Sequence, residues 1–238
     1  MIRRTPAALL VLAFAACTPT AKRPTQDDFK DQERAIVMAV GVQDTTQLKN
    51  GQWALYSVRS DDSSASLSTR IAVVNVEGGH FWIENRSVTP SGPGGRPRTL
   101  VSKYQIDASA KPLQIWIGEM PTPRPVKLYP GEDANGKPIP PIKPPTPDPS
   151  AKVEIAQERI TIATTGKSFD CTRLTSRATY KDGRQTTLVT WCCPDVPFSA
   201  VHNGKSYGGV VRRTYGGHTL ELAAMGTDAV PELSIPEK

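Results

Sequence analysis

One stretch decides the fold class of this chain: Leu67-Ser68-Thr69-Arg70-Ile71-Ala72-Val73-Val74-Asn75-Val76, then Gly78-Gly79, then His80-Phe81-Trp82-Ile83-Glu84. The first run partly alternates between polar and apolar side chains, which is typical of a strand with one buried face. The glycine pair is a turn signal, and the aromatic run after it is again strand-like. The stretch therefore predicts two antiparallel strands joined by a tight turn.

Similar strand-like runs, separated by turn signals, continue along the chain. They lie at Trp53–Val58, Arg98–Ile106, Leu113–Ile117, Val153–Ala163, Ser168–Tyr180, Arg184–Trp191, Gly209–Arg213 and Thr219–Ala224. One helix is expected at about residues 26–40, because Thr25 or Asp27 can cap it and Gly41 can end it. This pattern predicts a mainly β (α+β) fold with an antiparallel sheet or open barrel, not alternating strand–helix units.

A proline-rich segment interrupts the strands. Residues 121–149 hold half of the 22 prolines, and such a stretch cannot sit in a central strand. We expect residues 121–151 to form a long surface loop inserted into a single domain of residues 26–228. The alternative is a spacer, or a binding site for a protein partner that recognises proline-rich segments.

The N-terminus has the features of an export signal that ends on a cysteine. Arg3 and Arg4 precede the short apolar run Ala7–Ala16, which is followed by Cys17. The run is well short of the roughly 20 residues that a membrane-spanning helix needs. We therefore expect residues 1–16 to be a signal peptide, Cys17 to carry lipid (diacylglycerol and palmitate chains), and residues 17–25 to be a tether. The alternative is an ordinary signal peptide, which would leave a secreted or periplasmic protein.

The formal net charge of +6 comes from basic residues scattered along the chain. This distribution is typical of a solvated surface, with contact to anionic lipid headgroups as the alternative. No basic helix or aromatic–basic motif is present, so a nucleic-acid partner is not expected.

Three cysteines remain after Cys17, and an exported protein favours a disulfide between two of them. Asp182-Gly183 predicts a hairpin turn. A three-residue loop would place Cys171 opposite Cys193, whereas a two-residue loop would place it opposite Pro194. Cys171–Cys193 is the first expectation and Cys171–Cys192 the second, while a Cys192–Cys193 bridge would be strained.

The sequence contains no complete enzyme motif. Gly166-Lys167-Ser168 and Gly204-Lys205-Ser206 both lack the first glycine of a phosphate-binding loop. The histidines are isolated, and no cysteines or histidines have the spacing of zinc ligands. We expect no catalytic residues, no cofactor and no metal. A thiol-active enzyme using Cys192 or Cys193 is the enzymatic alternative.

Two parts of the chain carry a family resemblance. The segments Gly51–Tyr56 and Gly79–Glu84, together with Phe169–Thr172 and Thr190–Pro197, resemble the LolA and LolB superfamily of lipoprotein carriers. The resemblance covers about residues 26–228 and leaves residues 229–238 as a C-terminal tail. It implies an unclosed antiparallel half-barrel wrapped around the N-terminal helix, with an apolar concave face. The proline-rich insertion departs from the family pattern and leaves the strand order near it open.

The family is one of carriers, not enzymes, and it implies shelter for acyl chains or the handling of lipid-modified proteins. We expect a protein anchored to the periplasmic face of the outer membrane that binds lipid or lipoprotein cargo. The alternative is a structural envelope protein that binds a protein partner. The candidates for lining the concave face, each of which could instead be ordinary core, are Trp53, Tyr56, Phe81, Trp82, Tyr104, Trp116 and Trp191.

Overall fold

The structure is a computed structural model and describes residues 40–61, 63–89, 97–121, 125–128, 152–179, 183 and 185–235. The expected signal peptide, the lipid attachment site Cys17 and the tether lie outside these residues. So do residues 26–39 of the expected helix and most of the proline-rich segment. The described residues contain no helix, so the wrapping of the sheet around a helix remains a prediction.

Twelve strands make up the described chain. They are β1 (Trp53–Ser60), β2 (Ser63–Glu77), β3 (His80–Thr89), β4 (Arg98–Ile106), β5 (Pro112–Met120), β6 (Val126–Leu128), β7 (Lys152–Thr161), β8 (Ser168–Thr179), β9 (Gln185–Cys193), β10 (Ser199–His202), β11 (Lys205–Tyr215) and β12 (His218–Gly226). Every strand-like run of the sequence is a strand, which confirms that part of the prediction. The short strands β6 and β10 were not predicted.

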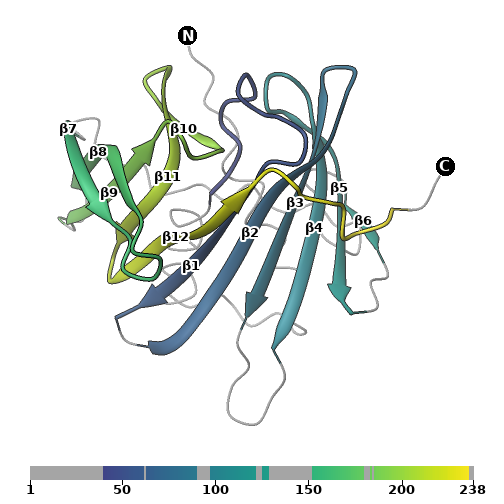
Figure 1. The fold of residues 1–238 in the computed structure, drawn as a ribbon, viewed down its shortest axis with the longest axis horizontal. Coiled ribbons are helices and arrows are strands. Elements are labelled where there is room, and N and C mark those ends of the chain that lie inside the picture. The colour runs from purple at the N-terminus through teal and green to yellow at the C-terminus, as the bar shows by residue number, and fades with distance from the viewer. Residues whose placement is uncertain are drawn as a thin grey trace.

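All the strands belong to one antiparallel sheet with the order β6-β5-β4-β3-β2-β1-β12-β11-β9-β8-β7, and β10 pairs with β11 at its side (Figure 1). The sheet is open, because β6 and β7 form its two ends and do not pair with each other. This confirms a mainly β fold built on an open antiparallel sheet. The proline-rich residues connect these two end strands, so the segments on either side of them belong to the same sheet.

The sheet consists of two meanders that meet at one strand pair. Strands β1 to β6 follow one another in space as in sequence, and β7 to β12 do the same apart from β10. The last strand, β12, then pairs with the first, β1, from Trp53↔Gly226 to Ser60↔His218. This pairing of two segments distant in sequence makes one sheet of the two halves.

The register divides the side chains between two faces, because residues directly opposite one another share a face and neighbours along a strand alternate. We call one the tyrosine face: it carries Tyr56, which pairs with Thr69, and Tyr104, which pairs with Ile83. The other is the tryptophan face. It carries a row of successive partners across five strands, namely Trp53, Ala72, Glu84, Lys103 and Trp116.

The tyrosine face carries much of the main apolar core. Tyr56, Ile83 and Leu220 are fully buried there. Each such side chain contributes roughly 1.5–3 kcal/mol relative to an exposed position. The same cluster continues into residues beyond this face, including Phe169 and Phe198. No helix of the described residues is long and apolar enough to cross a membrane.

The hairpin of β8 and β9 has the register that a three-residue loop predicts. Thr172 pairs with Cys192 and Thr179 with Gln185, so Cys171 lies opposite Cys193 in the continued register. The residues of the loop lie outside the described ones, except Gly183, whose φ of 81° is a conformation that glycine adopts readily.

Gly209 in β11 gives a test of this fold. A Cβ atom there would overlap the carbonyl oxygens of Pro197 and Val196, and both belong to backbone. We expect Gly209→Ala to lower the free energy of unfolding by about 3 kcal/mol, because the backbone must shift. Gly41→Ala, with nothing near its added methyl group, should change it by less than about 0.5 kcal/mol. Urea unfolding followed by circular dichroism measures both, and equal stability of the two variants would contradict the packing of β11.

Candidate functional site

The aromatic residues proposed to line one concave face do not share a face. Tyr56 and Tyr104 lie on the tyrosine face, together with Phe81, which pairs with Ile106. All four tryptophans lie on the opposite face. Trp53 and Trp116 belong to its central row, Trp82 alternates with Ile83, and Trp191 pairs with Arg212. The candidates therefore form two sets with different surroundings.

On the tyrosine face, two phenolic hydroxyl groups are buried without a hydrogen-bond partner. They are those of Tyr56, which is fully buried, and Tyr104. Burial raises the pKa of each phenol above its usual value, and the Arg213 guanidinium opposes this in part for Tyr56. Both groups therefore stay protonated and can each donate one hydrogen bond. A buried polar group without a hydrogen-bond partner lowers the free energy of unfolding by about 1–3 kcal/mol.

Other polar groups of the tyrosine face form hydrogen bonds with one another. The Thr69 hydroxyl donates to Asn85 Oδ1 at 2.8 Å, and Ser87 lies 3.5 Å from the same hydroxyl. Farther along the sheet, Arg213 Nε donates to Thr190 Oγ1 at 3.2 Å. The face is therefore mostly apolar, with a small number of placed polar groups.

On the tryptophan face, a cation lies over each indole ring. Arg70 lies 5.2 Å from the ring centre of Trp53, Lys103 5.7 Å from Trp82, Lys127 5.7 Å from Trp116 and Arg212 5.9 Å from Trp191. Such contacts stabilise by about 0.5–1 kcal/mol at exposed sites. All four tryptophans are only partly buried. Trp53, Trp82 and Trp116 form a polar-aromatic surface with their cations, whereas Trp191 also packs against the main apolar cluster.

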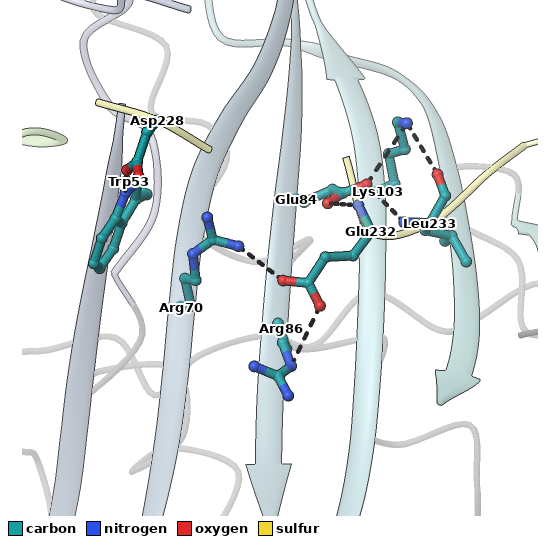
Figure 2. Close-up of polar contacts among 8 residues, drawn as sticks. All are labelled: Trp53, Arg70, Glu84, Arg86, Lys103, Asp228, Glu232 and Leu233. Atoms are coloured by element: carbon teal, nitrogen blue, oxygen red, sulfur yellow. Dashed lines mark hydrogen bonds and ion pairs between the residues drawn. The ribbon is translucent and has the colours of Figure 1, made fainter. Parts of the chain in front are cut away.

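The C-terminal segment lies across this surface. We call residues 227–235 the strap; it leaves β12 and crosses the neighbouring strands in Figure 1. Figure 2 shows its anchoring contacts: Trp53 Nε1 donates to Asp228 Oδ1 at 2.7 Å, and Arg70 and Arg86 contact the two carboxylate oxygens of Glu232 at 2.8 and 3.4 Å.

The centre of the strap is held by a buried ion pair. Glu84 Oε2 and Oε1 accept hydrogen bonds from the amides of Glu232 and Leu233 at 2.8 and 3.0 Å. Lys103 Nζ donates to the Leu233 carbonyl at 3.0 Å and lies 3.6 Å from Glu84 Oε1. None of these residues was a site candidate from sequence. A charged residue at position 84, after the aromatic run, was the available signal, but its partners in the strap are more than 140 residues away in sequence.

The three described cysteines lie on different faces. Cys171 and Cys193 face each other on the tryptophan side, whereas Cys192 alternates with Cys193 and lies beside Tyr56 and Arg213. Burial raises the thiol pKa of Cys171 to about 12 and that of Cys192 to about 11. None of the three forms a disulfide in the structure, and Cys171–Cys193 remains a prediction. No group of His, Cys, Asp and Glu in the described ranges could hold a metal ion.

Comparison with known proteins gives only distant matches. No family model and no curated protein matches the chain. A Bacteroides fragilis protein with a YmcC-like fold matches with a TM-score of 0.32 and 10% identity, over 75% of this chain and 96% of that one. A DUF1329 family protein from Desulfovibrio piger matches with a TM-score of 0.28 and 10% identity, over 87% and 94%. Similarity at this level carries no argument about fold or function, which therefore follow from the chain's own strands and contacts.

The unpartnered hydroxyl of Tyr104 predicts an unusual response to substitution. Tyr104→Phe removes a buried group that gains nothing from its surroundings, so the free energy of unfolding should stay constant or rise by up to about 1 kcal/mol. Thr69→Val removes a satisfied hydrogen bond and should lower it by about 1 kcal/mol. Urea titration of both variants measures the difference. A clear loss of stability in Tyr104→Phe would mean that this hydroxyl has a partner.

The register also predicts which cysteines join on oxidation. Cys171 and Cys193 should form the bridge, because Cys192 points to the other face of β9. Cys192→Ser should keep the bridge and Cys193→Ser should lose it. Non-reducing peptide mapping of the oxidised protein measures this, and a Cys171–Cys192 linkage would contradict the register.

Proposed function

We propose that this protein is a lipid-anchored protein of the bacterial envelope that shelters an acyl-bearing ligand against the tyrosine face of its open sheet. The observation that carries the proposal is the pair of buried, unpartnered hydroxyl groups of Tyr56 and Tyr104 in an apolar face. The ester or carboxyl oxygens of a lipid accept hydrogen bonds, so such a ligand would satisfy donors that the protein leaves unpaired.

The apolar residues of the same face supply the complementary surface. Ile71, Ile83 and Leu220 belong to the main cluster on this side of the sheet and are buried in the structure, so the acyl chain would take the place of side chains that now cover them. Each methylene group that an acyl chain buries contributes about 0.8 kcal/mol, so even a short contact adds measurable affinity. The opposite face suits such a ligand less well, because arginine, lysine and glutamate side chains occupy it.

The export signal supports the proposed location. Arg3, Arg4 and the apolar run before Cys17 are typical of a lipoprotein signal, and an acylated Cys17 would hold the sheet beside a source of lipid. The resemblance to the LolA and LolB carriers points the same way. We propose the periplasmic side of the outer membrane as the site of attachment.

The role is proposed to be carriage and not catalysis. A thiol nucleophile needs a pKa near or below neutrality, whereas burial raises that of Cys192 to about 11. Burial also raises the thiol pKa of Cys193. The acid–base properties of both thiols therefore oppose the enzymatic alternative, in which Cys192 or Cys193 attacks a substrate.

Native mass spectrometry of the full chain, purified from bacterial membranes, tests the proposed ligand. We expect lipid to co-purify with the wild type and the affinity for it to fall about 10-fold in Tyr56→Phe/Tyr104→Phe, because two hydrogen bonds of about 0.7 kcal/mol each are lost. The lipid-bound fraction of the double variant should therefore be lower. Tyr207→Phe, a substitution at a partly exposed tyrosine, should keep the lipid. A wild-type protein free of lipid, or equal occupancy in the double variant, would exclude this ligand site.

A separate experiment tests the anchor. Cys17→Ala should abolish incorporation of labelled palmitate and move the protein from the membrane fraction to the soluble periplasmic fraction, because the acyl chains provide the attachment. Cys192→Ala should remain labelled and membrane-bound. Retention of the label in Cys17→Ala would place the modification on another residue.

A further inference from the structure

The strap is bound as an extended peptide is bound by a receptor. Glu84 accepts hydrogen bonds from two consecutive amides, and Lys103 donates to the carbonyl of the second of these residues. These contacts recognise main-chain atoms, which every peptide offers. Peptide-recognition sites commonly combine such main-chain hydrogen bonds with pockets for a few side chains.

Only two strap side chains are recognised at this point, and they differ in chemistry. The Glu232 carboxylate lies between the Arg70 and Arg86 guanidinium groups, and the Leu233 side chain is fully buried. Val230, by contrast, is 67% exposed, and Pro231 and Ser234 are exposed as well. The contacts therefore select a carboxylate followed by a large aliphatic residue. They do not depend on the exposed side chains on either side of this pair.

The strap is separable from the main core. Leu233 is buried but does not belong to the main apolar cluster, which includes Tyr56, Ile83 and Leu220. Without the strap, Glu84 and Lys103 would face water, where both charges are well solvated. The groove can thus exist empty without leaving a charge buried and unpaired.

We propose that Arg70, Glu84, Arg86 and Lys103 form a peptide-binding groove, which the strap occupies as an intramolecular ligand and which accepts an extended segment of a partner protein. The recognised segment carries a carboxylate residue followed by leucine, isoleucine or methionine. This site lies on the tryptophan face, so it does not depend on the proposed lipid ligand of the other face.

The strap and a partner segment compete for the groove, and the strap has the advantage that it is covalently attached. The strap follows β12 directly, so its effective concentration at the groove is on the order of millimolar. A partner must therefore bind more tightly than the strap, or be held nearby, to replace it. In the free protein the groove is closed to weak ligands.

A chain that ends at Ala229 provides the test, because it keeps the Trp53–Asp228 contact and vacates the groove. The probe is a fluorescein-labelled peptide with the sequence of residues 229–235, measured by fluorescence anisotropy. We expect the shortened chain to bind this peptide at least 10-fold more tightly than the full chain, in which the strap competes.

Matched variants of the peptide and of the groove test which side chains contribute to binding. The Glu232→Gln and Leu233→Ala peptides should each bind about 10-fold more weakly, whereas Val230→Ala should bind like the parent peptide. In the shortened chain, Arg70→Ala should weaken binding about 10-fold. Arg98→Ala is the control, because this arginine pairs with Glu119 away from the groove.

Three outcomes would overturn the proposal. One is a folded shortened chain that does not bind the peptide at millimolar concentration, and another is equal binding of a scrambled peptide. The third is a dimer of the full chain that disappears on shortening, which would make a second copy the occupant. If the shortened chain does not fold, the full-length Glu232→Gln/Leu233→Ala variant replaces it in the same titration, with the same interpretation.

Discussion

The pairing of β1 with β12 is the constraint on which the rest of the molecule depends. It joins the first strand to the last and makes one sheet of two meanders. Its register pairs Tyr56 with Leu222 and Trp53 with Gly226, and an irregularity between Leu55 and Tyr56 lets these two pairs lie on opposite faces. Gly226 is required there, since a Cβ atom would come within 2.6 Å of Trp53 Nε1. The strap begins at this last pair, so the same pairing that joins the two halves of the sheet also directs the C-terminus across the tryptophan face.

Local patterns in the sequence predict local structure well. The strand Arg98–Ile106 has the expected bounds, and of the two loop lengths considered for the Asp182-Gly183 turn, the three-residue one gives the observed register, with Cys171 opposite Cys193. The order of the sheet could not be predicted, because the partner of β1 lies at the other end of the chain and periodicity carries no information about such pairings. The four-residue strand β10 is too short to show a period.

The candidate site shows the same limit. Trp82 and Tyr104 are equally plausible as lining from composition alone, but the alternation of β3 and the pairing of Ile83 with Tyr104 place them on opposite faces. The hydrogen bonds from the strap to Glu84 span more than 140 residues. A buried carboxylate in an aromatic strand indicates that a partner exists, but it does not tell which segment supplies it.

The buried Glu84–Lys103 pair bears on what the strap is for. Apolar side chains in place of a buried ion pair are often as stable or more so, since the charges lose their hydration. A strap that only closed the structure could therefore be held by apolar contacts. Charges instead leave the groove stable in water when empty and make binding depend on correctly placed amides and a carboxylate, as reversible recognition requires. The lipid proposed for the tyrosine face requires the opposite environment, and an open sheet can supply both because its two faces are separate surfaces.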